Sequence, residues 1–314
     1  MLQRSRSVGG VVGVLAGATA IATAPMFAVL AHDWSQLSPT VTAMWRTGLA
    51  APILWGLLLW REGGLLSRPE GTPVWTIWFL LPGLCFAGDL GSWHASMTII
   101  AAGTATFLAN LAVIMVPIVA WLWFKERPPK PFFIGAVVAI SGAALLLVPP
   151  GRGVLQTLPG SGANYVWGNA LGVLTAVWYG AYQLSTKRAR DFGSTLRVMT
   201  WSTAVCSVVL LVVALGMDEP LWPRSPRGWY PLFGMALFAQ TLGQGLIAWS
   251  LGRIPASYVS VGLLWQPVAA SLLGYVVLGQ TLSAAQIMGM LVVLAGLFLA
   301  TRTKLGAYRR RQAP

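Results

Sequence analysis

The sequence predicts an all-α integral membrane protein with ten transmembrane helices in two inverted five-helix repeats. Three observations predict this fold class: the composition, the spacing of apolar runs, and a similarity between the two halves of the chain. The chain has 314 residues, of which 56% are hydrophobic and 9% are charged. A soluble domain carries about 25% charged residues, so this chain could not cover the surface of a soluble globule. Its mean hydropathy of +0.69 also indicates a lipid environment.

Apolar runs long enough to cross a bilayer, about 20 residues each, recur along the chain between short polar stretches. A signal peptide is an alternative for residues 1–31, but the apolar run is long for one, and we favour an uncleaved first helix. The ten predicted spans are Val8–Leu30, Val41–Trp60, Val74–Thr98, Ala101–Phe124, Phe132–Val148, Ala163–Leu184, Leu196–Met217, Trp229–Leu251, Ala256–Leu278 and Ala284–Thr301.

The positive charges predict the orientation. The net charge of +13 would on its own fit a nucleic-acid-binding protein. With the N-terminus inside and ten crossings, however, only Arg152, Arg224 and Arg227 fall in outer loops. Arg46 falls within a span, and all other Lys and Arg fall on the inner side, which is the positive-inside pattern. We therefore expect a multi-pass protein of a cell membrane, with the bacterial inner membrane as the expected one. Both termini are then cytoplasmic, the lipid bilayer surrounds the chain, and no nucleic acid is a partner.

The two halves of the chain resemble each other. Five helices per copy is an odd number, so the second copy must be inverted relative to the first. Inverted repeats are typical of secondary transporters, which hold substrate near the bilayer midplane between the repeats. The matched positions are Ala102 and Ala256, Gly135 and Gly289, Gly142 and Gly296, Leu145 and Leu299, and Glu126 and Gln280. The predicted organisation is a first repeat at 8–148, a loop at 149–164, a second repeat at 165–301 and a basic cytoplasmic tail at 302–314.

Several motifs resemble the EamA-type transporters of the drug/metabolite transporter superfamily. Ala87–Ser96 has an acidic residue with Trp four positions later, and Thr104–Asn110 and the helix end Trp121–Arg127 follow it. In the second half, Pro267 and Leu278–Leu282 resemble the same pattern, with Gln in place of the family's usual Glu. The resemblance covers nearly the whole chain. It implies a fold like that of ten-helix exporters of amino acids and related metabolites, and it does not specify a substrate.

Ionisable residues inside a span are costly and are candidates for function. Arg46 in the second span and Asp89 in the third lie at similar predicted depth, so we expect them either to form an ion pair or to share a water-filled cavity. A buried pair that only fixes helix register is the alternative. Trp93 lies one helical turn from Asp89, and His94 follows it near the outer interface, as a proton relay or a plain interfacial histidine.

Uncharged polar and aromatic residues also gather near the predicted midplane. Such residues either line a substrate cavity or make interhelical hydrogen bonds, and we favour a cavity for the set as a whole. Its members are Asn110, Gln240, Thr241, Gln244, Gln266, Trp178, Tyr179, Tyr182 and Trp265. Prolines inside spans, which can kink a helix, are Pro25, Pro82, Pro117 and Pro267.

Motifs for catalysis and energy coupling are missing from the sequence. There is no phosphate-binding P-loop, no His-Glu-x-x-His zinc motif and no Gly-x-Ser-x-Gly elbow. Cys85 and Cys206 lie in apolar spans and are expected to pack rather than bind metal. We therefore expect no enzyme activity, metal or cofactor. The expected function is alternating-access transport of a small polar or amphipathic metabolite, outward, driven by protons through Asp89 or His94 or by exchange. A channel or a non-transporting binding protein is the alternative, and a homodimer is left open.

Overall fold

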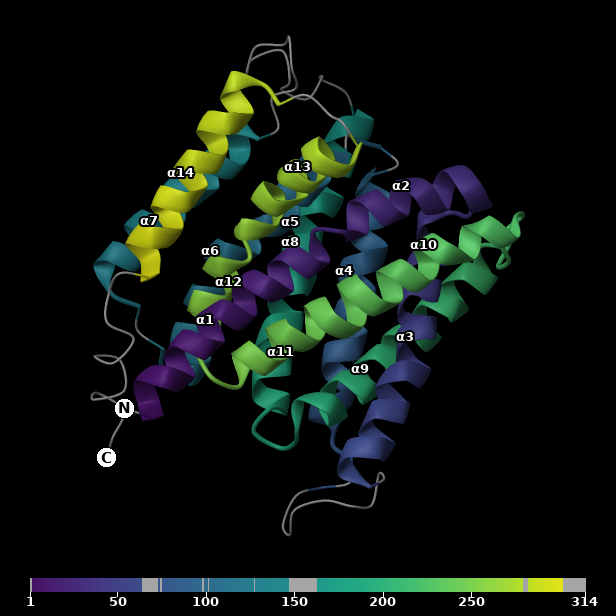
Figure 1. Cartoon of the computed structure of the whole chain (residues 1–314), viewed down its shortest axis with the longest axis horizontal. Coiled ribbons are helices and arrows are strands. Elements are labelled where there is room, and N and C mark those ends of the chain that lie inside the picture. The colour runs from purple at the N-terminus through teal and green to yellow at the C-terminus, as the bar shows by residue number, and fades with distance from the viewer. Residues whose placement is uncertain are drawn as a thin grey trace.

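The computed structural model describes residues 2–63, 73, 75–97, 99–100, 102–126, 128–146, 163–278 and 282–301. Within these ranges all regular elements are helices, packed into one bundle (Figure 1). Residues 149–162 of the predicted loop at 149–164, the tail at 302–314, Arg127 and Gln280 lie outside the described residues. The last two residues of that loop, Ala163 and Asn164, belong to α8 instead. The elements are α1 (Leu2–Ile21), α2 (Ala24–Ser35), α3 (Pro39–Glu62), α4 (Ile77–Met97), α5 (Ala102–Asn110), α6 (Ala112–Phe124), α7 (Lys130–Leu145), α8 (Ala163–Ala189), α9 (Thr195–Gly216), the 3₁₀ turn η2 (Pro226–Gly228), α10 (Trp229–Gly234), the π-helix η3 (Met235–Gln244), α11 (Gly245–Leu251), α12 (Ala256–Gly262), α13 (Trp265–Leu278) and α14 (Ala284–Thr301).

Each predicted span coincides with one of these helices or with a run of them, so the all-helical prediction is confirmed. By length and composition, five helices in the described ranges are able to cross a membrane, and α7 and α14 are shorter apolar helices. The first, fourth and ninth spans are not single helices as predicted. They are interrupted between α1 and α2, α5 and α6, and α12 and α13. Pro25 and Pro267 lie in the first turns of α2 and α13. A proline is tolerated in a first turn, but it has no N–H to donate to a carbonyl four residues earlier, so the helix cannot continue unbroken from the preceding segment.

The packing of α7 against α14 shows the inverted relation of the repeats. A Cβ on Gly135 would lie 2.6 Å from the carbonyl oxygen of Gly296, and one on Gly142 would lie 2.7 Å from that of Gly289. The chain therefore runs along α7 and α14 in opposite directions. Gly289 is the repeat counterpart of Gly135, and Gly296 is that of Gly142. The contacts are crossed: Gly135 lies beside Gly296, and Gly142 lies beside Gly289. A two-fold relation between antiparallel copies produces this pattern.

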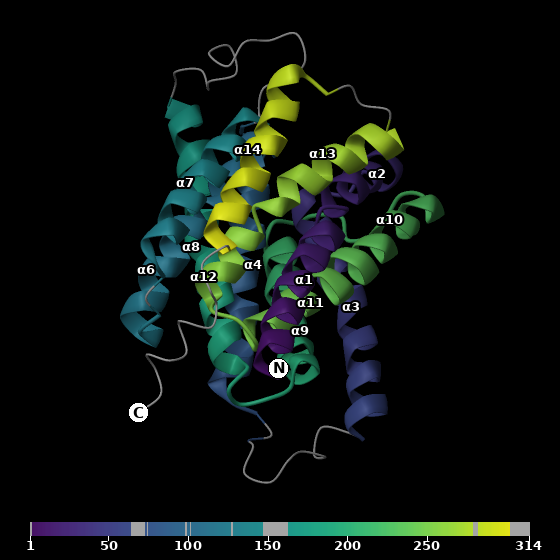
Figure 2. The ribbon, with the colours of Figure 1, turned by 60° about the vertical axis from the view of Figure 1, so that its left-hand side comes forward.

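The two repeats are interlocked rather than side by side. The first helix of one repeat packs on the third and fourth spans of the other: α1 on η3, α11, α12 and α13, and α8 on α4, α5 and α6. Figure 2 shows α1 running beside α11 and α13. The second helices α3 and α9 also pack together, and Thr200 Oγ1 donates a hydrogen bond of 3.2 Å to the Leu54 carbonyl. Because the first helix of each repeat packs on the other repeat, segments from both repeats surround the centre of the bundle.

One end of the bundle is rich in cations. We call it the basic end: α3, α6, α8 and α11 end there, and α4, α7, α9 and α12 begin there. Between this end and the centre lies a buried apolar layer to which α6, α11 and α12 contribute, for example through Val116, Ile247 and Val259. The described basic residues at this end are Arg61, Lys125, Lys130, Lys187, Arg188, Arg190, Arg197 and Arg253.

Candidate functional site

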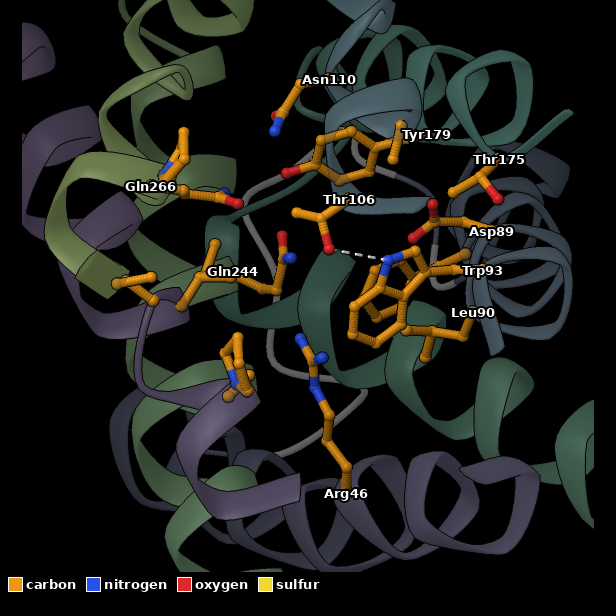
Figure 3. Close-up of a pocket in the computed structure, with 18 residues that line it drawn as sticks. Arg46, Asp89, Leu90, Trp93, Thr106, Asn110, Thr175, Tyr179, Gln244 and Gln266 are labelled. Carbon is orange, nitrogen blue, oxygen red and sulfur yellow. Dashed lines mark hydrogen bonds between the residues drawn. The ribbon is translucent and has the colours of Figure 1, made fainter. Parts of the chain in front are cut away.

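A cavity of about 110 Å³ lies between the two repeats. A buried water needs roughly 10–15 Å³ of such volume, so the cavity has room for several waters or one small solute. Both repeats contribute to its wall, which joins the α1–α2 break to α3, α4, α5, α8, η3 and α13 (Figure 3). The lining residues are Ile21, Ala22, Ala24, Pro25, Arg46, Phe86, Asp89, Leu90, Trp93, Thr106, Ala109, Asn110, Thr175, Tyr179, Gln244, Gln266, Pro267 and Ala270.

All three helix breaks lie at this cavity. Ile21 and Pro25 flank the first, Asn110 ends α5 at the second, and Gln266 and Pro267 follow the third. The first turns of α2 and α13 therefore face the cavity. In these turns Gln266 N–H donates to the Leu263 carbonyl, and Pro25 and Pro267 have no N–H, so the turns offer the partial positive charge of a helix N-terminus more than free backbone donors. In transporters, the N-termini of interrupted helices commonly point at anionic substrate groups.

Arg46 is held in the cavity wall by neutral partners. Its side chain is buried, and its Nε donates a hydrogen bond of 3.2 Å to Gln240 Oε1. Gln240 is held in turn, since its Nε2 donates to Thr203 Oγ1 at 3.2 Å. The guanidinium carbon lies 5.5 Å from the centre of the Phe86 ring. Figure 3 shows the guanidinium directed into the cavity, so it is a fixed cation facing this space.

Asp89 is the carboxylate of the same cavity. Its side chain is 7% exposed. The predicted ion pair with Arg46 is wrong: in the described part of the chain, neither an ion pair within 4.0 Å nor a hydrogen bond involves this carboxylate. The two residues share a cavity instead, which was the other expectation. Gln240 accepts only from Nε of Arg46, so the Nη groups of the guanidinium are directed into the cavity, and the side chains of Arg46 and Asp89 enter it from different sides (Figure 3).

Aromatic rings form another part of the wall. Tyr182 stacks on Phe86 with 4.6 Å between ring centres and on Tyr179 with 6.0 Å. Tyr182 does not line the cavity; its hydroxyl donates a hydrogen bond of 3.2 Å to Gln244 Oε1 and so orients a residue that does. Figure 3 shows the Tyr179 hydroxyl directed toward Gln266. The wall thus alternates apolar ring faces with a few oriented polar atoms, as ligand sites do.

Trp93 contributes an indole that is fixed from across the cavity. Its Nε1 donates a hydrogen bond of 3.2 Å to Thr106 Oγ1 (Figure 3). Thr106 and Thr175 also line the cavity, although they were not among the predicted site residues. Thr106 lies in the Thr104–Asn110 motif, and its place in that motif could have indicated that it belongs to the site. Thr175 offered no such indication, because a lone Thr in an apolar span is ordinary.

Six of the thirteen predicted site residues do not line the cavity. Tyr182 and Gln240 lie behind it, as described. His94 is buried in the last turn of α4, and its ring lies 5.0 Å from that of Trp93. Trp178 is 37% exposed and covers Gly88. Thr241 donates a hydrogen bond of 2.7 Å to the Ala236 carbonyl, and Trp265 Nε1 donates one of 2.8 Å to Thr19 Oγ1.

The other seven predicted residues all line it, and they come from both repeats. Three belong to the second and third spans, one to the fourth, one to the sixth, and two to the eighth and ninth. They are Arg46, Asp89, Trp93, Asn110, Tyr179, Gln244 and Gln266.

A polar cluster closes the bundle at the basic end. Glu126 is 3% exposed, and its Oε1 lies 2.9 Å from Lys187 Nζ. The same carboxylate accepts hydrogen bonds from Ser257 Oγ at 3.2 Å and from the backbone N–H of Ala256 at 3.3 Å. Glu126 belongs to the first repeat and its three partners belong to the second. We call this set the Glu126 cluster; it ties the end of α6 to α8 and to the start of α12.

Comparison with known proteins identifies the family. The model of the EamA-like transporter family matches residues 8–148 and again 166–302. The chain belongs to this family. The match to both halves supports the ten-helix, two-repeat architecture of an integral membrane protein. Membership makes the chain a transporter rather than an enzyme, embedded in a membrane and acting on a small-molecule substrate.

Individual EamA-like relatives agree with this assignment. The chain is 24% identical to "Uncharacterized transporter YyaM" of Bacillus subtilis (strain 168), covering 90% of both chains. It is 27% identical to a protein of Streptantibioticus cattleyicolor named "Probable terminal-alkyne amino-acid exporter", covering 68% of this chain and 67% of the relative. A crystal structure with 18% sequence identity superimposes with a TM-score of 0.75 over 98% of this chain and 99% of the other, which supports the fold.

Proposed function

We propose that this EamA-like protein exports small polar or amphipathic metabolites such as amino acids by alternating access. The observation that carries the proposal is the cavity between the repeats, which presents one cation, Arg46, and one carboxylate, Asp89, without an ion pair between them. Two opposite charges held apart in a small cavity are complementary to a zwitterion. The name of the Streptantibioticus relative supports the same substrate class.

A bound amino acid would use these groups in a defined way. Its carboxylate would accept hydrogen bonds from the Arg46 guanidinium, near the positive N-termini of α2 and α13. Its ammonium would donate to Asp89, with neutral acceptors such as Gln244 and Gln266 nearby. The rings of Phe86 and Trp93 would cover an apolar side chain. Each charge of the substrate then replaces water with a buried partner of opposite sign, which limits the cost of desolvation.

The orientation follows from the charges. The basic end faces the cytoplasm under the positive-inside rule, with both termini on that side. The Glu126 cluster and the apolar layer then close the cytoplasmic side, and the cavity lies in the outer half of the bundle, between α2, α5 and α13. This arrangement fits an outward-facing state of the cycle. Movement of the two interlocked halves of the bundle against each other would break the Glu126 cluster and expose the same cavity to the cytoplasm.

Energy coupling by protons, if present, would use Asp89. It is the ionisable acid in the cavity wall, whereas His94 does not line the cavity. A carboxylate that binds the substrate in one state and a proton in the other couples the two movements. Facilitated exchange needs no protonation, so a pH gradient applied across the membrane distinguishes these two drives.

The test is counterflow in proteoliposomes. Vesicles preloaded with unlabelled amino acids should take up the labelled amino acid with saturation, and both Asp89→Asn and Arg46→Gln should abolish this uptake while leaving the protein folded. Asp191→Asn is the matched control, because Asp191 pairs with Arg188 on the exposed surface. Flux without saturation would instead indicate a channel, and no flux with any metabolite class would indicate a binding protein.

A further inference from the structure

A second cavity, of about 330 Å³, lies between α4, α6 and α8. It shares no lining residue with the cavity of Arg46 and Asp89. Apolar side chains form most of its wall, among them Leu81, Met115, Val119, Val177 and Ala181. The Ser185 hydroxyl in this wall donates to backbone carbonyls of its own helix. A polar metabolite would find few partners here, so the expected occupant is a hydrocarbon chain.

The depth of this cavity matches one leaflet of a bilayer. Its lining extends along α8 from Val177 to Arg188. At about 1.5 Å per residue this stretch of helix rises about 16 Å, and half of a hydrocarbon core is about 15 Å. Arg188 marks the basic end of the cavity, and Val177 marks the level of the bilayer centre. An acyl chain that enters at the basic end would therefore fill it to the midplane.

The mouth of the cavity carries a cation among aromatic rings. The Arg188 side chain is 41% exposed, and its guanidinium carbon lies 5.7 Å from the centre of the Trp78 ring and 5.0 Å from that of Phe192. Its Nη1 lies 3.0 Å from Asp191 Oδ2, but that carboxylate is 59% exposed, and exposed pairs of this kind contribute little. Trp123, also at the mouth, is 67% exposed. Tryptophans mark the membrane interface, and basic pockets between spanning helices on the cytoplasmic side bind anionic lipid headgroups.

We propose that the α4–α6–α8 cavity binds one acyl chain of an anionic phospholipid from the leaflet at the basic end, with the lipid phosphate on the Arg188 guanidinium. The apolar wall binds the chain, and Arg188 selects the headgroup charge. Trp78 and Phe192 hold the guanidinium at the mouth.

The test is native mass spectrometry of the full-length protein, stripped of lipid in detergent and mixed with phosphatidylglycerol or phosphatidylcholine of identical chains. The wild type should retain phosphatidylglycerol in preference to phosphatidylcholine. Ala181→Trp places an indole inside the cavity and should remove binding of both lipids. Arg188→Gln should weaken phosphatidylglycerol binding about fivefold, as expected for one cation at a membrane surface. It should weaken phosphatidylcholine binding less, because the choline cation offsets the charge of the phosphate in that lipid.

Two controls separate this site from general lipid contact. Arg61→Gln removes an exposed cation at the same end, and Val137→Trp adds an indole to an exposed position on α7; neither should change binding. Equal phosphatidylglycerol binding by Ala181→Trp and the wild type would overturn the proposal. So would an unchanged headgroup preference in Arg188→Gln, which tests the proposal even if the Trp variant does not fold. Neither result bears on transport, because the two cavities are separate.

Discussion

Replacing Glu126 by Gln should open the basic end more often. The 2.9 Å pair with Lys187 has a gross Coulomb energy of about 6 kcal/mol at an effective dielectric constant of about 20, and desolvation of the buried carboxylate offsets much of it. Gln has a single amide oxygen, so it replaces only one of the two carboxylate oxygens: Lys187 and the Ala256 N–H bond Oε1, whereas Ser257 bonds Oε2. The net loss is therefore at least that of one charged hydrogen bond, about 1.5–3 kcal/mol. This corresponds to an increase of about 10- to 150-fold in the opened population.

A single cysteine reports this opening. Ser260 is 4% exposed and lies on α12, between the Glu126 cluster and the cavity. With Cys85 and Cys206 replaced by Ala, Ser260→Cys should react with a thiol reagent applied from the basic side faster in Glu126→Gln than in the parent, by the factor above. Asp191→Asn, which breaks an exposed pair, should leave the rate unchanged. An unchanged rate in Glu126→Gln would refute the assignment of this cluster as the closure.

Three further changes test the packing and the cavity wall. Gly142→Ala places a Cβ 2.5 Å from the backbone nitrogen of Val293 and should lower stability by about 1–3 kcal/mol through overpacking, seen as a lower melting temperature in detergent. Gly56→Ala, with nothing within 4 Å of its Cβ, should be neutral or raise stability by about 0.5–1 kcal/mol; an equal loss at both sites would contradict the close helix contact. Tyr182→Phe removes the hydrogen bond to Gln244 but keeps the ring stacking, so the free energy of unfolding should fall by about 0.6 kcal/mol. A loss as large as that of Gly142→Ala would contradict the view that the hydroxyl makes one ordinary interhelical hydrogen bond.

The spanning segments were predictable because the apolar runs and the short polar loops alternate so regularly. The helix breaks were not, since hydropathy does not distinguish a continuous span from an interrupted one. Pro25 and Pro267 predicted kinks close to two of the breaks. The third break is at Leu111, between α5 and α6, where no proline or glycine indicates it. Conversely, Pro82 and Pro117 lie inside helices that continue past them.

The cavity was partly predictable from residue chemistry. Arg46 and Asp89 stood out because ionisable side chains are rare inside a span. Their separation was not predictable, because hydropathy and spacing place two side chains at one depth but do not give the direction from which each enters the cavity. The bond of Gln240 to Arg46 Nε from the other repeat was not predictable either. Trp178 and Trp265 do not line this cavity; an aromatic residue in a span serves lipid contact and helix packing as well as it serves a ligand.

The most direct test of alternating access is two-sided labelling of the cavity. Gln266→Cys places a thiol in the cavity wall, in a background without Cys85 and Cys206. A membrane-impermeant maleimide should label it both in right-side-out vesicles and in inverted vesicles, and saturating transported amino acid should slow both reactions. Labelling that stays confined to one side, whatever solute is present, would contradict the account, because the cavity would then be a closed-ended pocket rather than a pathway.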